Sequence, residues 1–359
     1  MANSAEKAWL IVKRLALGIT LICAASAFLL LSDLQRRKKG MPQVAVLKYS
    51  TRPLLDAAVD GMIDGLARHG YVADETIALR IYDAQNEIPI AANIAKEITD
   101  GRYDLVMTAS TPCLQAVARA NAEGKCKHVF CAVTDPFGAG VGINRDNPLD
   151  HPPHLAGIGT FQPVELLFRL VKKDVFPGLK TVGVVWNPAE ACSEACTIKA
   201  RKICDELGIE LLEATVDKSS DVPDAANSLV SRGVEVIWIG GDNTVELAID
   251  ALVAAGRKGR IPIITHGPDN LENGILMALG ANYREVGLIA GEMAAKVLGG
   301  DDMAKMPVED VVPEKLAINV LALRGLKDPW RISPEMLERA DIVCDEKGTH
   351  RTEQPKVAK

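Results

Sequence analysis

The chain has 359 residues, 48% of them hydrophobic and 25% charged, which is typical of a globular protein long enough for two domains. Its net charge of −6 and the lack of a basic stripe in the globular part exclude a typical nucleic-acid-binding surface. Eight cysteines form no CxxC pair, and we find no set of ligands spaced for zinc, so we expect no metal and no cofactor.

An uncharged apolar run opens the chain. It extends from Leu15 to Leu31, a length of 17 residues, and basic residues lie on both sides of it. As a helix it would measure roughly 26 Å, which is at the short end for a bilayer but longer than the apolar core of a cleavable signal, about 7–15 residues. We predict a transmembrane signal anchor over 15–34, after a basic flank at 1–14 and before a linker at 35–41. A cleaved signal is the alternative.

Strands and helices alternate after the linker. Four strands are predicted at 44–49, 77–82, 105–109 and 129–133, and four more at 182–186, 211–216, 234–239 and 261–265. Helical stretches separate them, which favours parallel sheets in an α/β fold. Each strand of the second series begins 129 to 138 residues after its counterpart in the first. This near-constant offset predicts two similar lobes in tandem.

Further elements follow the second series. Two strands, at 274–279 and 316–320, flank a helix predicted over 284–298. The segment 327–345 contains a short helix over 333–343, for which Ser333 is a suitable N-cap and Pro334 suits the first turn. The polar tail at 346–359 is predicted to be disordered.

Polar residues gather in the loops that follow the predicted strands. In open parallel sheets ligands bind beyond the carboxyl ends of the strands, where helix N-termini also present free amides. Both lobes contribute to this set, which predicts a polar cleft between them. Its members are Tyr49, Ser50, Ser110, Thr111, Thr134, Asp135, Asn187, Glu190, Asp242, Asn243 and His266.

Helix capping explains part of this pattern equally well. Thr111 before Pro112 resembles an N-cap, and both Asn187-x-x-Glu190 and Asn243-x-x-Glu246 resemble capping boxes. Asp242 is harder to explain, because Asn243 would suffice as the cap. A single histidine such as His266 is more often structural than catalytic. No nucleophile elbow, phosphate-binding loop or dinucleotide fingerprint is found, so we expect a binding protein and not an enzyme.

Several short segments together carry a resemblance to a known family. The chain resembles the ABC-transporter substrate-binding proteins of the type I periplasmic fold, in the group associated with tryptophan or aromatic amino-acid uptake, over residues 42 to 345. The segments are Pro53-Leu-Leu-Asp56 with Gly61 and Gly65, Ser110-Thr111-Pro112, Val133-Thr134-Asp135-Pro136, Gly157-Ile-Gly159, Val182-Gly-Val-Val-Trp-Asn-Pro188 with Glu190 and Ser193, Glu213-Ala-Thr-Val216, Asp242-Asn243-Thr244-Val245, Ile261-Pro262, and Gly280-Ala-Asn-Tyr283 with Gly287.

The resemblance implies two doubly wound parallel-sheet lobes, a hinge and a ligand cleft. Three crossings near Gly159, Gly274 and Met306 would assign 42–158 and 275–304 to lobe 1, and 159–274 and 305–326 to lobe 2. Ser193 and Asn282 join the expected ligand contacts. An amino acid or related small carboxylate would place its carboxylate at Ser110-Thr111 and its ammonium group at Asp242 or Glu190.

Three positions depart from the family pattern. Arg52 stands where many relatives have His, Cys192 where they have Asn, and Thr265-His266 where they often have Ser-Asp. Without an acid at 266 the ligand need not be an aromatic amino acid. The expected partners are an ABC permease and ATPase, with the N-terminal helix in the inner membrane and the globular part facing the periplasm or exterior. The alternative is a ligand-binding sensor that reports to a membrane partner.

Overall fold

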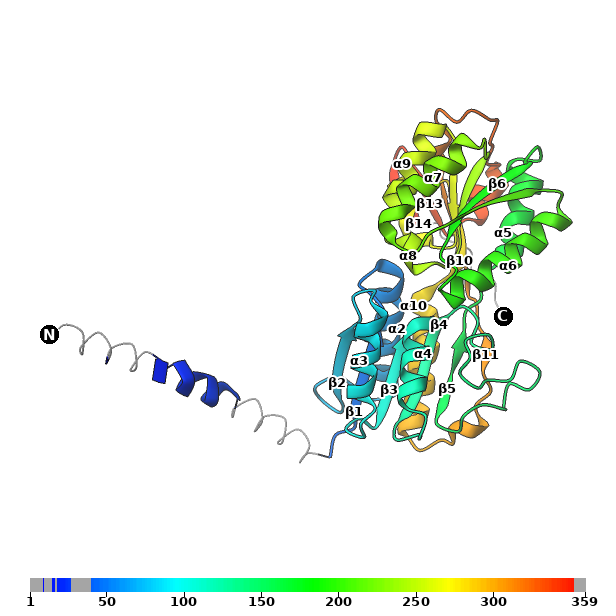
Figure 1. The fold of residues 1–359 in the computed structure, drawn as a ribbon. Coiled ribbons are helices and arrows are strands. Elements are labelled where there is room, and N and C mark those ends of the chain that lie inside the picture. Colours follow the sequence, from blue (N-terminus) through cyan, green and yellow to red (C-terminus); the bar gives the residue numbers. More distant parts are fainter. Residues whose placement is uncertain (1–8, 10–14, 17, 27–39, 352–359) are drawn as a thin grey trace, which may run out of the picture.

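The computed structural model describes residues 9, 15–16, 18–26 and 40–351, and residues 40–351 form two lobes that meet at a narrow waist (Figure 1). Within the described residues, no helix is both long enough and apolar enough to cross a membrane. Residue 17 and residues 27–34 of the predicted anchor lie outside the described part. The anchor therefore stays a prediction from sequence.

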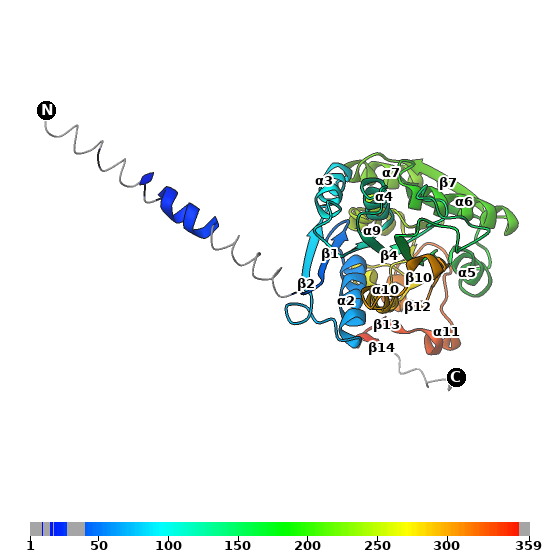
Figure 2. The same ribbon diagram turned by 90° about the horizontal axis from the view of Figure 1, so that it is seen from below.

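Lobe 1 is built on a six-stranded sheet whose neighbouring strands are all parallel. In sheet order the strands are β11 (Glu309–Asp310), β5 (Leu155–Gly159), β4 (Lys127–Val133), β3 (Leu105–Ala109), β1 (Gln43–Lys48) and β2 (Ala78–Asp83). Helices α2 (Pro53–Arg68) and α10 (Tyr283–Leu298) pack together, as do α3 (Ile88–Ile98) and α4 (Thr111–Ala120) (Figure 2). The predicted strands of the first series are confirmed to within two residues.

Glycines set the spacing between α2 and α10. Gly61 and Gly65 lie one turn apart on α2, and Gly287 and Gly291 lie one turn apart on α10. A Cβ atom at any of the four would collide with backbone atoms of the facing helix. The two helices therefore pack backbone against backbone, which ties the late segment α10 to the first helix of lobe 1.

Lobe 2 is built on an eight-stranded sheet. In sheet order it contains β14 (Gly348–Arg351), β13 (Ile342–Asp345), β12 (Glu314–Asn319), β10 (Met277–Ala281), β9 (Ile263–Thr265), β8 (Val236–Ile239), β6 (Thr181–Trp186) and β7 (Glu210–Thr215). The β10–β12 and β13–β14 pairs are antiparallel and the remaining pairs are parallel. The α/β prediction is confirmed, but this sheet is mixed and not wholly parallel.

Both faces of this sheet are buried, and successive side chains along a strand point into the two cores in turn. Val184 of β6 and Trp238 of β8 pack in the core that includes α5 (Val164–Leu170), α6 (Ala191–Glu206) and α11 (Pro334–Arg339). Val185 and Ile237, the adjacent positions, pack in the core that includes α7 (Val222–Ser231) and α9 (Ile249–Gly259). Such two-sided burial is why these strands read as continuous apolar runs in the sequence.

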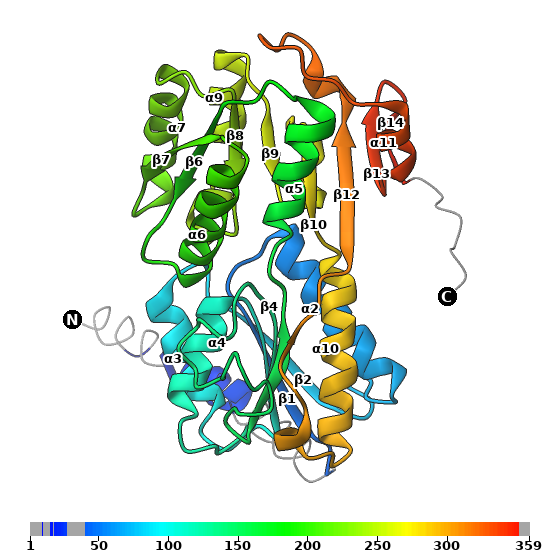
Figure 3. The same ribbon diagram turned by 90° about the vertical axis from the view of Figure 1, so that its right-hand side faces the viewer.

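Three segments connect the lobes, and two of them cross later than predicted (Figure 3). The chain leaves lobe 1 after Gly159, at the end of β5. It returns at Asn282 and not at Gly274, because β10 pairs with β9 and β12 of lobe 2 before α10 begins. The last crossing, residues 311–313, follows β11, which pairs with β5 of lobe 1, so the predicted crossing at Met306 is also too early.

The C-terminal segment differs most from the prediction. Helix α11 ends at Arg339, and the last two residues predicted for it, Ile342 and Val343, instead begin β13, which pairs with β12. Strand β14 then folds back on β13, so residues 348–351 belong to the sheet and not to a disordered tail. Apolar Ile342 and Val343 suit either a helix or a strand, and pairing with lobe 2 selects the strand. Residues 352–359 lie outside the described part.

Candidate functional site

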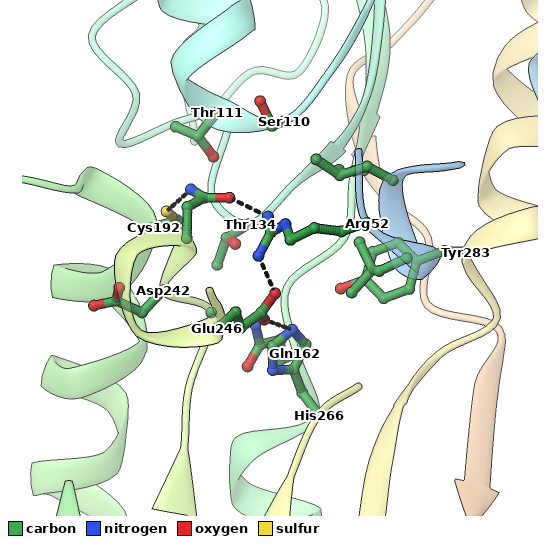
Figure 4. A pocket seen from close by; sticks show the side chains of 15 residues that line it. Arg52, Ser110, Thr111, Thr134, Gln162, Cys192, Asp242, Glu246, His266 and Tyr283 are labelled. Carbon is green, nitrogen blue, oxygen red and sulfur yellow. Dashed lines mark hydrogen bonds and ion pairs between the residues drawn. The ribbon is translucent and has the colours of Figure 1, made fainter. Parts of the chain in front are cut away.

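A cavity lies between the lobes, and both lobes and a connecting segment line it (Figure 4). Lobe 1 contributes the start of α2, the start of α4, the end of β4 and the start of α10. Lobe 2 contributes α8 (Asn243–Glu246) with the residues before it, one residue of α6 and the residue after β9. The lining consists of Arg52, Leu54, Leu55, Ser110, Thr111, Ala132, Thr134, Gln162, Cys192, Gly241, Asp242, Asn243, Glu246, His266 and Tyr283.

The lobe 1 wall contains two residues with unfavourable backbone angles. Ser110 has φ of 111° and Ala132 has φ of 53°, values that side chains with a Cβ atom rarely adopt. Such conformations cost on the order of 1–3 kcal/mol each and tend to occur at functional sites. Ser110 is also the N-cap of α4, where its Oγ accepts a hydrogen bond from the Cys113 backbone N–H at 3.4 Å. The strained loop thus presents the N-terminus of α4 to the cavity.

Two buried carboxylates of lobe 2 are fully engaged by the lobe itself. Glu190 accepts hydrogen bonds from the backbone N–H groups of Asn243 and Thr244, both at 2.9 Å. Asp242 accepts from the Asn187 N–H and the Ser193 hydroxyl, both at 2.6 Å. These bonds fix the start of α8 against the loop before α6.

Burial and the repulsion of Glu190 raise the pKa of Asp242 to about 7, while the hydrogen bonds from Ser193, Val245 and Asn187 oppose that rise. Because every oxygen of Asp242 and Glu190 already has protein donors, a ligand ammonium group would have to displace bonds that hold α8 in place. The ligand ammonium contact predicted for Asp242 or Glu190 stays a prediction, and these hydrogen bonds make such a contact unfavourable.

The caps of these helices differ from the sequence-based prediction. Ser110, not Thr111, is the N-cap of α4. Asp242, not Asn243, caps α8, with its Oδ1 accepting from the Val245 N–H at 2.8 Å. Asn187 turns its side chain to the Ala189 N–H at 2.9 Å instead of forming a capping box. Asp242, whose role the sequence did not explain, is therefore the N-cap of α8.

An ion pair crosses the cavity from one lobe to the other. The Arg52 guanidinium pairs with Glu246 and donates to the Asn243 Oδ1 at 2.6 Å (Figure 4). His266 Nε2 lies 3.0 Å from the other carboxylate oxygen of Glu246. The Arg52 and Glu246 side chains are 11% and 10% exposed, so solvent screens their attraction little. Burial alone would raise the pKa of Glu246, but Arg52 and His266 outweigh it and hold that pKa below its usual range.

Three polar atoms of the lining have no hydrogen-bond partner among the described residues. They are Thr111 Oγ1, Gln162 Oε1 and His266 Nδ1, and each belongs to a side chain that is at least nine-tenths buried. Buried polar groups are nearly always hydrogen-bonded, since leaving one unpaired costs about 1–3 kcal/mol. The unpaired atoms come from lobe 1, lobe 2 and the segment between them, so a ligand in the cavity could contact all three parts.

The cavity brings together some of the predicted ligand contacts and not others. Six of them line it: Ser110, Thr111, Thr134, Asp242, Asn243 and His266. Seven do not, namely Tyr49, Ser50, Asp135, Asn187, Glu190, Ser193 and Asn282. Tyr49 packs in the lobe 1 core, Asp135 pairs with Arg145 at 2.6 Å, and Asn282 directs its amide to Glu285. Their contact with a ligand remains a prediction.

Nine lining residues were not among the sequence-based candidates, among them Arg52, Gln162, Glu246 and Tyr283. Arg52 was noted only as a departure from the family, and Glu246 only as the third residue of a supposed capping box. Two opposite charges at positions next to predicted helix starts were a usable signal for that pair. Gln162 and Tyr283 lie where the chain passes between the lobes; no local pattern distinguishes Gln162, and Tyr283 was noted only as the end of the family segment Gly280-Ala-Asn-Tyr283.

Comparisons with known proteins agree with this architecture. A family model described as ABC transporter substrate binding protein matches residues 43–342. A protein named tyrosine-binding protein from Clostridioides difficile strain R20291 is 27% identical over 300 residues, which cover 84% of this chain and 85% of that protein.

Solved structures give the same result. A conserved domain protein from Vibrio cholerae O1 biovar eltor has 29% identity and a TM-score of 0.78, covering 84% of this chain and 99% of that one. An ABC domain in complex with L-Trp from Streptococcus pneumonia has the same TM-score and coverage at 23% identity, which shows the fold alone. The ligand-free, open structure of a Clostridium difficile substrate binding protein with adhesive properties gives 0.63 at 27% identity, covering 82% and 97%.

Proposed function

This chain belongs to the family of ABC transporter substrate binding proteins, a family of solute-binding proteins and not of enzymes, and on that premise we propose that it is the ligand-binding component of an importer that closes two lobes on an amino acid. The observation that carries the proposal is the set of three buried, unpaired polar atoms that surround the interlobe cavity within the described residues. A small polar ligand would satisfy them.

The preferred ligand class is an amino acid with an aromatic side chain. One relative is named for tyrosine, and a structural neighbour was solved with L-Trp. In this chain Leu54, Leu55 and Tyr283 give the cavity an apolar side against which a ring would pack. On the polar side, the N-terminus of α4 with the unpaired Thr111 hydroxyl suits the ligand carboxylate, since helix N-termini attract anions.

Membrane attachment and delivery complete the proposal. The apolar run from Leu15 to Leu31 would tether the globular part to the outer face of the cytoplasmic membrane. The closed clamp would then hand its ligand to an ABC permease driven by an ATPase. Support for this part comes from the sequence and from family membership.

Calorimetric titration of the full chain in detergent tests the proposed ligand class. The panel is L-tyrosine, L-tryptophan, L-phenylalanine and L-leucine, with ribose and myo-inositol as members of a different chemical class. We expect saturable binding of one or more aromatic amino acids and none of the sugars. Binding of a sugar without any amino acid would overturn the amino-acid proposal while leaving a solute-binding role in place.

A further inference from the structure

Arg52 and Glu246 are the only two charged side chains of the cavity lining, among the described residues, that face each other across the two lobes as an ion pair. Both are close to nine-tenths buried, and the other titratable groups of the lining are Cys192, Asp242, His266 and Tyr283. Asp242, the remaining charged residue of the lining, is held by hydrogen bonds from Asn187, Ser193 and Val245 within lobe 2. Arg52 and Glu246 are therefore the charged side chains with which a charged ligand in this cavity would interact most directly.

Charge balance limits which ligands can do so. Removing one partner of a buried ion pair leaves an uncompensated charge and is strongly unfavourable. A ligand with a carboxylate alone would draw Arg52 away and leave Glu246 with only the His266 ring. A ligand with an amine alone would occupy Glu246 and leave Arg52 with only the neutral Asn243 and Ser50 oxygens. A ligand that carries both groups leaves neither residue unpaired.

We propose that the Arg52–Glu246 pair opens to admit a zwitterion, so that Glu246 binds the ligand ammonium group and Arg52 turns to the ligand carboxylate. In the absence of ligand the same pair holds the two lobes together. This inference rests on the proposed amino-acid-binding function and assigns its charge selectivity to two residues.

The assignment also accounts for a departure in the sequence. Position 266 is a histidine where relatives often have an aspartate, so the chain has one acid fewer available to an ammonium group. Glu246 supplies a carboxylate in contact with that histidine, 3.0 Å from His266 Nε2, and it faces the cavity, whereas Glu190 does not. The negative charge is therefore kept at this corner of the site by a residue from a different element.

Binding of L-tyrosine and of two analogues tests the charge selectivity. Tyramine lacks the carboxylate, and 3-(4-hydroxyphenyl)propionate lacks the ammonium group. We expect the full chain to prefer L-tyrosine over each analogue by at least about tenfold. In Glu246→Gln the preference over the propionate should fall to within about twofold while that over tyramine persists. In Arg52→Gln the reverse is expected, with the preference over tyramine lost.

Two controls keep this test decisive. The double variant Arg52→Gln/Glu246→Gln removes both charges at once, so it should fold even if a single variant does not, and it should lose both preferences. Arg68→Gln and Glu292→Gln alter an exposed ion pair of lobe 1 and should change neither preference. If L-tyrosine binds and the single variants weaken all three ligands by the same factor, the inference is wrong although the proposed function stands.

Small-angle X-ray scattering of the ligand-free protein tests the pair without any ligand. We expect a smaller radius of gyration for the wild type than for Arg52→Gln, because the variant loses the bond between the lobes. Equal radii would show that the pair does not hold the lobes together and would overturn that half of the inference. Failure of every amino acid to bind in the calorimetric panel would instead refute the proposed function, and the scattering result would still stand.

Discussion

Glu190 joins the loop before α6 to the start of α8 through Thr244, whose backbone N–H and hydroxyl donate to the same carboxylate oxygen at 2.9 and 2.6 Å. The other oxygen accepts from the N–H and side-chain amide of Asn243 at 2.9 and 2.7 Å. Glu190 is buried, so these bonds are shielded from water. Its main task in this structure is to hold α8 in position, which in turn orients Glu246 toward the cavity.

Substitution of Glu190 should therefore lower the stability of the fold and have no direct effect on ligand contacts. In Glu190→Gln one acceptor oxygen becomes an NH₂ group, which must face a backbone N–H donor of either Asn243 or Thr244. We expect a loss of about 2–4 kcal/mol in the free energy of unfolding, measured by urea titration. Glu194→Gln, an exposed change on the same helix, is the control and should cost less than about 0.5 kcal/mol. Unchanged stability in Glu190→Gln would contradict this structural role.

Thr111 offers the complementary case of a residue expected to matter for binding and not for folding. Its hydroxyl has no hydrogen-bond partner among the described residues, so Thr111→Val removes a polar atom that contributes nothing to the ligand-free fold. We expect the melting temperature to stay the same or rise, while affinity for the bound amino acid falls about tenfold, the equivalent of one hydrogen bond of about 1.4 kcal/mol. Calorimetric titration measures the affinity and thermal unfolding measures the melting temperature of Thr111→Val, with the exposed Thr349→Val as the control variant. An unchanged affinity would remove Thr111 from the proposed carboxylate site.

Any side chain added at the four glycines between α2 and α10 should destabilise the protein. In Gly287→Ala the new Cβ would overlap the carbonyl oxygen of Ala58, so the helices must separate. We expect a loss of about 1–3 kcal/mol in the free energy of unfolding, despite the better helix propensity of alanine. Ala67→Ser, on the exposed side of α2, should be close to neutral. A stabilised Gly287→Ala variant would show that the helices have room that the structure does not indicate.

The raised pKa of Asp310 leads us to expect that the stability of the protein depends on pH. Asp310 keeps part of its surface exposed, yet the atoms packed around its carboxyl desolvate it, and this desolvation, followed by the charge of Asp135, raises its pKa to about 6 from 3.8, while Arg145 opposes the shift. The folded protein thus holds this proton more tightly than the unfolded chain does. The resulting stabilisation is fully present below about pH 4 and is lost as the pH rises through about 6.

Asp310→Asn removes this contribution. The melting temperature of the variant, relative to the wild type, should therefore increase between about pH 4 and pH 7, measured by thermal unfolding in a series of buffers. Glu309→Gln changes the neighbouring carboxylate of the same two-residue strand, and this control should show a constant difference. A constant difference for Asp310→Asn as well would mean that the Asp310 carboxyl titrates normally in the folded protein.

Much of the architecture could be predicted from the sequence, because its signals are local. The apolar runs that became β1, β3 and β6 and the amphipathic stretches that became α2 and α10 need only a few residues to be recognised. Ser110 and Thr111 were placed at the site by the same local logic, since polar residues that follow a strand and precede a helix reach the cleft of a parallel sheet. The choice of sheet for β10 and the strand conformation of β13 could not be predicted, because both depend on hydrogen bonds to strands far away in the chain.

The sequence by itself determined the two α/β lobes and the family, since periodicity and motif order are properties of short segments. Only the tertiary structure decided which acids bind donors within lobe 2 and which one pairs with Arg52 across the cavity. Glu190 and Asp242 immediately precede α6 and α8, and Glu246 lies within the first turn of α8, so the three acids look alike in the sequence. The packing of α8 turns Glu190 and Asp242 to backbone donors of lobe 2 and turns Glu246 toward Arg52, because each buried carboxylate must find partners for its charge and those partners come from separate elements.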